Sequence, residues 1–183
     1  MTDCFPVAVP YLRPATERVK WPKGHKLGLQ RTAMLGSEPI FTIHAELAPI
    51  MNLGRTPYGE RRMIAITGGT VAGRKLNGRV LPGGADWQIV RNDGAADIKA
   101  RYTIESAAGA RILVSSEGLR HGPPAVMERL GRGEHVDPAL YYFRTAMRFE
   151  TADPSVDWIN RILALAHGQR EANAVRLDVY EVE

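Results

Sequence analysis

Three neighbouring segments, ERRMIAI (60–66), GGTVAG (68–73) and LPGGADWQ (81–88), carry the clearest structural signal in this chain. Short apolar runs alternate in them with glycine pairs, which is typical of antiparallel strands joined by tight turns. A tryptophan and several ionisable residues stand beside the glycines. We therefore expect a small β-barrel with a pocket near these turns.

The flanking sequence extends the same pattern. Between Pro39 and Leu53, apolar and polar residues alternate as in a strand with one buried face. Further strands are predicted over 62–67, 75–81, 87–91, 97–106, 111–117, 140–151, 163–169 and 174–182, with glycine-containing turns between them. The predicted fold is mainly β: a closed antiparallel β-barrel of about eight strands.

Two short helices interrupt the strands. Pro124 opens a segment that ends at Gly131, and Asp153 is a predicted N-cap in front of a second helix. Residues 1–37 are rich in proline and are predicted to form an irregular N-terminal arm, which either wraps the outside or reaches a neighbouring subunit. Residues 38–183 are predicted to form a single β-barrel domain.

Composition limits the function classes. The chain has 183 residues, of which 44% are apolar, and this is enough for one core. The net charge is +4, but the arginines are spread among acidic residues, so we expect no nucleic-acid partner. No apolar run is long enough to span a membrane and no secretory signal is recognisable, which predicts a cytoplasmic protein without a membrane partner.

Several segments together resemble the bacterial and fungal family known as domain of unknown function 3237. They are 60–62, 68–73, 81–88, 100–102, 120–123, 142–145, 148–151, 158–160 and 179–182. The resemblance covers roughly residues 39–182. It implies a closed antiparallel barrel of about eight strands, a homodimer, and cofactor-independent lyase or decarboxylase activity on lignin-derived aromatic acids.

The strand predicted over 140–151 has one apolar and one charged face. Tyr142, Arg144 and Glu150 share the charged face because side chains alternate along a strand. This face either meets water or lines the mouth of the barrel. In the second case Arg144 and Arg101 could converge on one substrate carboxylate. The alternative for Arg101 is a structural ion pair with Glu105 or Glu150.

Other side chains are candidates for proton transfer. A nearby arginine would lower the pKa of Tyr102 or Tyr142 and make that tyrosine a base, although either ring could simply pack in the core. His44 or His121 could act as an acid or base, or could be structural. Candidates for protonating a leaving oxygen are Glu150 and Glu117.

The remaining candidates would bind the substrate. Asp86, Trp87 and Gln88 follow a Pro-Gly-Gly turn, where the backbone can approach a ligand closely and Trp87 offers a flat wall. Core packing is the alternative for Trp87. Arg120 and His121 precede a Gly-Pro turn and join this group.

No cofactor is expected. The five histidines lack metal-ligand spacing, so no metal site is predicted. The glycines lack both phosphate-loop and dinucleotide spacing and are interpreted as turns.

The predicted function is a cofactor-independent lyase, most simply a decarboxylase. Its partner would be a small phenolic aromatic carboxylic acid that supplies its own electron sink through a quinone methide. The alternatives are a barrel that binds such an acid without turnover and a cofactor-free isomerase.

Overall fold

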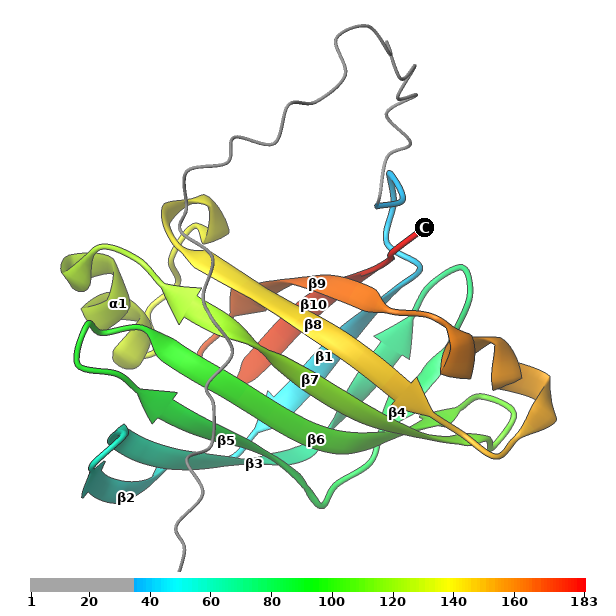
Figure 1. The fold of residues 1–183 in the computed structure, drawn as a ribbon, viewed down its shortest axis with the longest axis horizontal. Helices are drawn as coiled ribbons and strands as arrows, with labels where there is room; N and C mark the ends of the chain where they lie inside the picture. Colours follow the sequence, from blue (N-terminus) through cyan, green and yellow to red (C-terminus); the bar gives the residue numbers. More distant parts are fainter. Residues whose placement is uncertain (1–34) are drawn as a thin grey trace, which may run out of the picture. The chain divides into compact units, whose positions relative to one another are not determined.

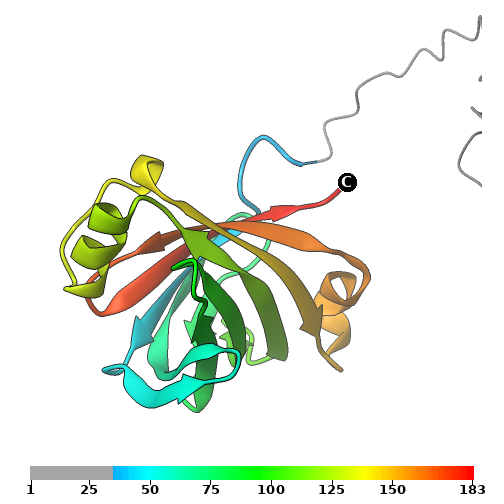
Figure 2. The same ribbon diagram turned by 60° about the vertical axis from the view of Figure 1, so that its left-hand side comes forward.

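A single antiparallel sheet of ten strands closes on itself in the computed structural model, which describes residues 35–183 (Figure 1). Around the barrel the strands are β1 (Phe41–Leu47), β10 (Ala174–Glu181), β9 (Ala164–Arg170), β8 (Tyr142–Glu150), β7 (Arg111–His121), β6 (Ala96–Ser106), β5 (Gly84–Val90) with β4 (Gly78–Val80), and β3 (Gly59–Ala72). Pairing of β3 with β1 completes the circle. Figure 2 shows the strands curling into this closed wall.

The barrel has eight strand positions, as predicted. Strands β4 and β5 follow one another, and each pairs with both β3 and β6, so they share one position. The tenth strand, β2 (Met51–Thr56), pairs only with the first part of β3 and extends beyond the barrel wall as a hairpin. Ten strands, less β2 and with β4 and β5 counted together, give eight.

One prediction about glycines is wrong. Gly68 and Gly69 are not in a turn but inside β3, where the register between β1 and β3 shifts. Gly69 has a φ of 136°, and a Cβ at this position would collide with the carbonyl oxygen of His44. Glycine thus permits a bulge that lets one long strand pair first with β2 and then with β1.

The break between β1 and β2 was also missed. The sequence alternates without interruption from Pro39 to Leu53, but the structure divides this segment at residues 48–50. The two parts pair with different halves of β3, and the interruption lies next to the bulge.

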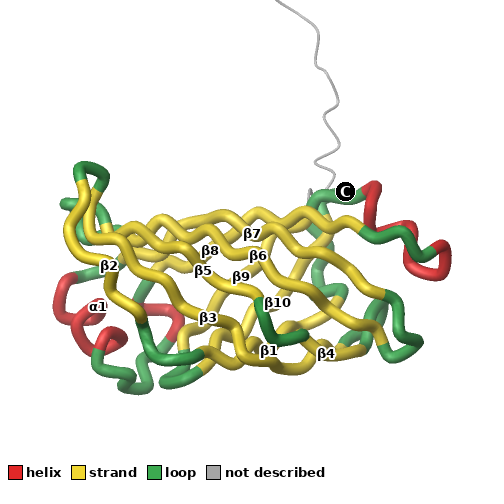
Figure 3. Tube along the Cα trace, turned by 90° about the horizontal axis from the view of Figure 1, so that it is seen from below, coloured by secondary structure: helices red, strands yellow, loops and turns green. Residues whose placement is uncertain are grey.

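The two predicted helical segments lie at opposite ends of the barrel. The helix α1 (Pro124–Gly131) covers one end, and the 3₁₀-helix η2 (Pro154–Arg161) lies at the other (Figure 1). The carboxylate of Asp153 accepts a hydrogen bond from the backbone N–H of Ser155, which is the predicted N-cap. A one-turn 3₁₀-helix, η1 (Pro138–Leu140), precedes β8. Figure 3 shows that strands make up the length between the ends.

Alternate residues of each strand fill the interior, and the half near η2 is apolar. Phe41 and Phe149 meet edge to face with ring centroids 5.9 Å apart, while Ile104, Ile112 and Ile159 are inaccessible to solvent. This half of the barrel is a conventional packed core, so any ligand site must lie towards α1.

The arm predicted over residues 1–37 lies almost wholly outside the described residues, which begin at Leu35. Leu35 itself forms an isolated antiparallel bridge with Val182. None of the helices within residues 35–183 has the length and hydropathy of a membrane-spanning segment.

The packed half can be tested at Ile112. Replacing this fully buried side chain in Ile112→Ala should lower the free energy of unfolding by ~2–5 kcal/mol, because a cavity replaces its packing contacts. The neighbouring Leu113 points outward and is 39% exposed, so Leu113→Ala is the matched control and should cost less than about 1 kcal/mol. Urea unfolding measures both, and equal losses would contradict the assigned faces.

Candidate functional site

Polar side chains replace apolar ones inside the barrel towards α1. Asp86 and Gln88 of β5, Tyr102 of β6 and Thr145 of β8 line an inner chamber of about 40 Å³. Ser116 and Arg120 of β7 and Arg170 of β9 complete its polar wall. Side chains alternate along a strand, so Asp86 and Gln88 can both face inward only if Trp87 faces outward.

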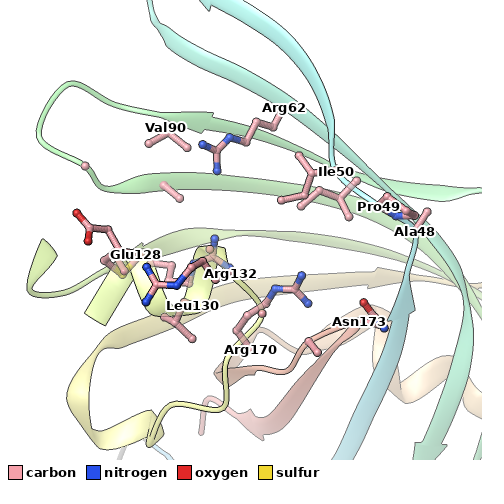
Figure 4. Close-up of a pocket in the computed structure, with 18 residues that line it drawn as sticks. Ala48, Pro49, Ile50, Arg62, Val90, Glu128, Leu130, Arg132, Arg170 and Asn173 are labelled. Carbon is pink, nitrogen blue, oxygen red and sulfur yellow. The ribbon is translucent and has the colours of Figure 1, made fainter. Parts of the chain in front are cut away.

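A larger cavity of about 570 Å³, which we call the mouth, lies next to the chamber. The two spaces adjoin, because Ile64, Arg120 and Arg170 line both of them. Arg62 projects from one wall of the mouth, and Arg132 and Arg170 lie across from it (Figure 4). Four arginines and a single acid, Glu128, line the mouth among the described residues, which makes it suited to an organic anion.

A row of three residues positions Arg120. Arg120 of β7 lies opposite Phe143 of β8, and Gly168 of β9 lies against the Phe143 ring. Because Gly168 has no side chain, the Phe143 ring packs against its backbone, where a Cβ would lie only 2.5 Å from Cγ of Phe143. The Arg120 guanidinium lies 5.7 Å from the centroid of the same ring. Gly168 thus sets the position of Phe143, and Phe143 supports Arg120.

Asp86 is a partly buried carboxylate that accepts two hydrogen bonds. Gln88 Nε2 donates a 2.5 Å hydrogen bond to Asp86 Oδ2, and the backbone N–H of Lys99 donates one of 3.1 Å to Oδ1. Burial nevertheless raises the pKa of Asp86, and the hydrogen bonds and nearby arginines offset this only in part. A carboxyl group of raised pKa is a better proton acceptor than an exposed aspartate and more readily becomes a proton donor.

Burial also perturbs the neighbouring groups. It lowers the pKa of Arg120 to about 10, with a further contribution from Arg170, so Arg120 stays cationic at neutral pH. It raises the pKa of Tyr102, and the charge of Asp86 acts in the same direction. Tyr102 is therefore a hydroxyl donor or acceptor rather than a phenolate, and the expectation that an arginine lowers its pKa is wrong.

Four buried polar atoms on the chamber wall lack a hydrogen-bond partner within residues 35–183. They are Gln88 Oε1, Tyr102 OH, Arg120 Nε and Thr145 Oγ1. Buried polar groups in folded proteins are almost always paired, since each unpaired one costs ~1–3 kcal/mol. The chamber is thus built to hydrogen-bond a group other than its own side chains.

The structure brings four of the predicted site residues together in the interior: Asp86, Gln88, Tyr102 and Arg120. The other eight do not lie there. They project from the outer surface of the barrel and are Tyr142, Arg144, Arg101, His44, Glu150, Trp87, Glu117 and His121.

These eight residues lie outside because the apolar face of each strand points into the barrel. In β8 the sequence suggested that the charged face could line a pocket, but Phe143, Met147 and Phe149 share the opposite face and must leave water. Only one face can point inward, so Tyr142 and Arg144 point out. In β6 the burial of Tyr102 and Ile104 leaves Arg101 outside for the same reason.

The outward residues form contacts of their own. The rings of His121 and Tyr142 stack at 5.0 Å, and the Arg144 guanidinium lies 5.3 Å from the Tyr142 ring. His44 Nε2 is 2.9 Å from a carboxylate oxygen of Glu171. Arg101 and Arg144 lie on the outer faces of β6 and β8, so the convergence expected for them inside the barrel is absent.

Trp87 is 48% exposed, so it neither lines the chamber nor packs in the core, which were the two roles that the sequence had suggested. Glu105, one expected ion-pair partner of Arg101, instead binds Arg79 and Arg111.

Four interior residues were missed: Arg62, Ser116, Thr145 and Arg170. The sequence already indicated that these residues face inward, because each stands an even number of positions from buried apolar or small residues of the same strand. Ser116 follows Ile112 and Val114 at steps of two, and Arg170 follows Ala164, Ala166 and Gly168 in the same way. No group of three or more His, Cys, Asp and Glu side chains within residues 35–183 is arranged to hold a metal ion.

The fold and the site define an antiparallel β-barrel with a polar inner chamber beneath an arginine-lined mouth. The family described as "Protein of unknown function (DUF3237)" matches residues 36–182. The chain belongs to this family, which confirms the resemblance noted in the sequence.

Relatives of similar length support the assignment. The UPF0311 protein RPA1785 of Rhodopseudomonas palustris is 40% identical over 151 residues, covering 82% of this chain and 99% of the relative. Its crystal structure has a TM-score of 0.77 at 39% identity, covering 83% and 99% of the two chains. A structure described as a beta-barrel like protein from Acinetobacter baumannii has a TM-score of 0.71 at 41% identity, covering 81% and 96%.

A more distant structure, described as an enzyme from Penicillium herquei, shares the fold. Its TM-score is 0.56 at 21% identity, and the match covers 81% of this chain and 97% of that one.

The burial of Asp86 predicts a pH-dependent stability. Its pKa is higher in the folded protein than its ordinary value of 3.8, so the wild-type free energy of unfolding falls as the pH rises from 3.8 through the raised pKa. Asp86→Asn lacks this loss, so the Tm of this variant relative to that of wild type should rise over that interval. Calorimetry at several pH values measures this.

Asp93 provides a control of opposite sign. A hydrogen bond from Arg91 lowers the pKa of this exposed carboxyl to about 2, so its contribution to stability is present above pH 3.8. Asp93→Asn should therefore lose a little stability relative to wild type as the pH rises. A Tm difference for Asp86→Asn that is independent of pH would show that Asp86 is not perturbed.

Gly168→Ala tests the packing that supports Arg120. A methyl group at this position would displace the Phe143 ring, so the free energy of unfolding should fall by ~1–3 kcal/mol. Gly131→Ala is the matched control, because a Cβ there meets nothing within 4 Å and alanine favours a helix. Thermal unfolding measures both variants, and a neutral Gly168→Ala would contradict the close packing.

Proposed function

We propose that this protein is a cofactor-independent lyase, most simply a decarboxylase, that acts on a small phenolic carboxylic acid in the mouth and inner chamber. The observation that carries the proposal is the presence of one partly buried carboxyl group of raised pKa, Asp86, beside two interior guanidinium groups, Arg120 and Arg170.

The charge arrangement supports an anionic substrate. Neither Arg120 nor Arg170 forms an ion pair with an acidic side chain within 4 Å in the described part of the chain, so both are free to bind a carboxylate. Arg170 Nη1 donates to the carbonyl oxygen of Ala174, which anchors the side chain and leaves its other donors available. Guanidinium groups bind carboxylates through two parallel hydrogen bonds.

Asp86 is the proton acceptor in this proposal, as the sole carboxylate among the described residues that line the inner chamber. It removes the phenolic proton, and the resulting phenolate expels a benzylic leaving group to give a quinone methide. The electron pair of the bond to the carboxyl group then flows into the quinone methide, and carbon dioxide departs. The products are a vinyl phenol, carbon dioxide and the protonated leaving group, so the reaction consumes one proton overall.

Departure of neutral carbon dioxide leaves Arg120 and Arg170 without an anionic partner, whereas Arg62 and Arg132 keep their ion pairs with Glu60 and Glu134. The mouth is then ready to exchange product for another carboxylate, so binding and release follow from the same charges. Held orientation and preorganised charges supply the catalysis.

A barrel that binds the same acid without turnover is the second candidate. The unpaired polar atoms of the chamber favour it as well, because they would serve binding and catalysis equally. A cofactor-free isomerase is the third. Incubation with a panel of phenolic acids separates the three: carbon dioxide with a conjugated product marks the lyase, saturable binding alone marks the binding protein, and solvent deuterium in an unchanged skeleton marks the isomerase.

The variant that tests the arginine site is Arg120→Gln. It removes a buried charge that contacts the substrate carboxylate, so kcat/KM should fall ~100-fold or more. Arg148→Gln is the control, since Arg148 lies exposed on the outer face of β8, and its turnover should equal that of wild type. Product formation is followed by absorbance, and full activity of Arg120→Gln would remove the interior arginines from the proposal.

A further inference from the structure

The unpaired atoms of the inner chamber come from four adjacent strands and face one small space. Gln88 Oε1, Tyr102 OH, Arg120 Nε and Thr145 Oγ1 are supplied by β5, β6, β7 and β8. An arrangement in which four strands each leave a polar atom unpaired around one space lowers the stability of the fold. Their common orientation is explained if a polar group of a ligand enters the chamber.

The donors and acceptors of the chamber specify the chemistry of that group. Gln88 Nε2 already donates to Asp86, so the amide oxygen of Gln88 needs a donor from elsewhere. A carboxylate offers only acceptors and would leave this oxygen unpaired, whereas a hydroxyl group both donates and accepts. The hydroxyl groups of Tyr102 and Thr145 can supply the complementary hydrogen bonds.

Charge and size agree with this assignment. Asp86 lies in the chamber, and its charge helps to raise the pKa of Tyr102, so a second anion at this depth is disfavoured. The chamber of about 40 Å³ has room for a small head group, whereas the mouth of about 570 Å³ has room for the rest of a ligand. Arg62 and Arg132 line only the mouth, where they pair with Glu60 and Glu134. Arg120 and Arg170 line both spaces and form no such pair among the described residues, so the mouth holds all four positive charges. An anionic end therefore belongs in the mouth.

We propose that the inner chamber is a recognition site for an uncharged hydroxyl group, with Gln88, Tyr102 and Thr145 as the residues that determine specificity. The substrate enters hydroxyl end first, and its carboxylate stays among the arginines of the mouth. This inference rests on the proposed function and adds the orientation of the substrate and the requirement for a hydroxyl group at the end opposite the carboxylate.

Two acids that differ by one hydroxyl group provide the test: hydrocinnamic acid and its para-hydroxylated analogue. Titration calorimetry should give wild type an affinity for the hydroxylated acid at least ~10-fold higher, because the acid without it leaves buried polar groups unpaired. In the double variant Tyr102→Phe with Thr145→Val, this ratio should fall below about threefold. The affinity for hydrocinnamic acid itself should not change.

Two further variants separate the chamber from the mouth. Arg62→Gln should weaken both acids by a similar factor, because it lines the mouth and meets the carboxylate. Arg148→Gln on the outer face should alter neither. If the double variant does not fold, Thr145→Val alone keeps the side-chain shape and should still reduce the ratio.

The outcomes distinguish this inference from the proposed function. Equal wild-type affinities for the two acids, or no binding of either, would overturn the hydroxyl site, even if phenolic acids are turned over. A lowered Tm of the double variant with an unchanged ratio would overturn it as well, because the polar atoms would then be structural. A clear preference for the hydroxylated acid without turnover of any phenolic acid supports the hydroxyl site and rejects the lyase.

Discussion

Closure of the sheet between β1 and β3 is the constraint on which the rest of the structure depends. Once eight strand positions form a closed wall, every second residue of each strand must share one interior of limited volume. Near η2 that interior holds large apolar side chains such as Phe41, Ile104 and Ile112. Towards α1 polar side chains and small ones such as Ala100 and Ser116 take part in the lining, and the space that remains is the chamber.

The two halves of the barrel have opposite effects on stability. Apolar burial near η2 stabilises the fold, whereas the chamber removes Asp86, Tyr102 and Arg120 from water without full compensation. Residues that destabilise a fold while facing a common space are typical of functional sites. The rigid apolar half therefore allows the other half to hold polar groups in an unfavourable setting.

The sequence predicts the fold better than the site, and particular residues explain why. Alternation and glycine pairs are local signals, so strands such as β6 and β10 were predicted nearly to their ends. The bulge between Ile66 and Gly68 depends on the pairing with β1, and a local pattern cannot show it. Asp86 and Gln88 were correctly grouped because they follow a recognisable turn.

Tyr142 and Arg144 were predicted to face the pocket because their residue types suggested chemistry. The apolar residues Phe143 and Met147, which alternate with them, already indicated that the opposite face of the strand is buried. Applying the same alternation to β3, β7 and β9 would have added Arg62, Ser116 and Arg170 to the interior.

Arginine beside an aromatic ring occurs on both sides of the barrel wall, and the comparison shows what separates a site from a surface. Outside, Arg144 lies over Tyr142 at 5.3 Å, where water and salt screen its charge. Inside, Arg120 lies over Phe143 at a similar 5.7 Å, but its Nε is buried and its pKa is lowered to about 10. Since electrostatic interactions strengthen as the local dielectric constant falls, the interior arginine can act on a bound anion far more strongly than the exterior one. The chemistry of this barrel thus depends on which strand face is dry, and the same residue types have different roles on its two faces.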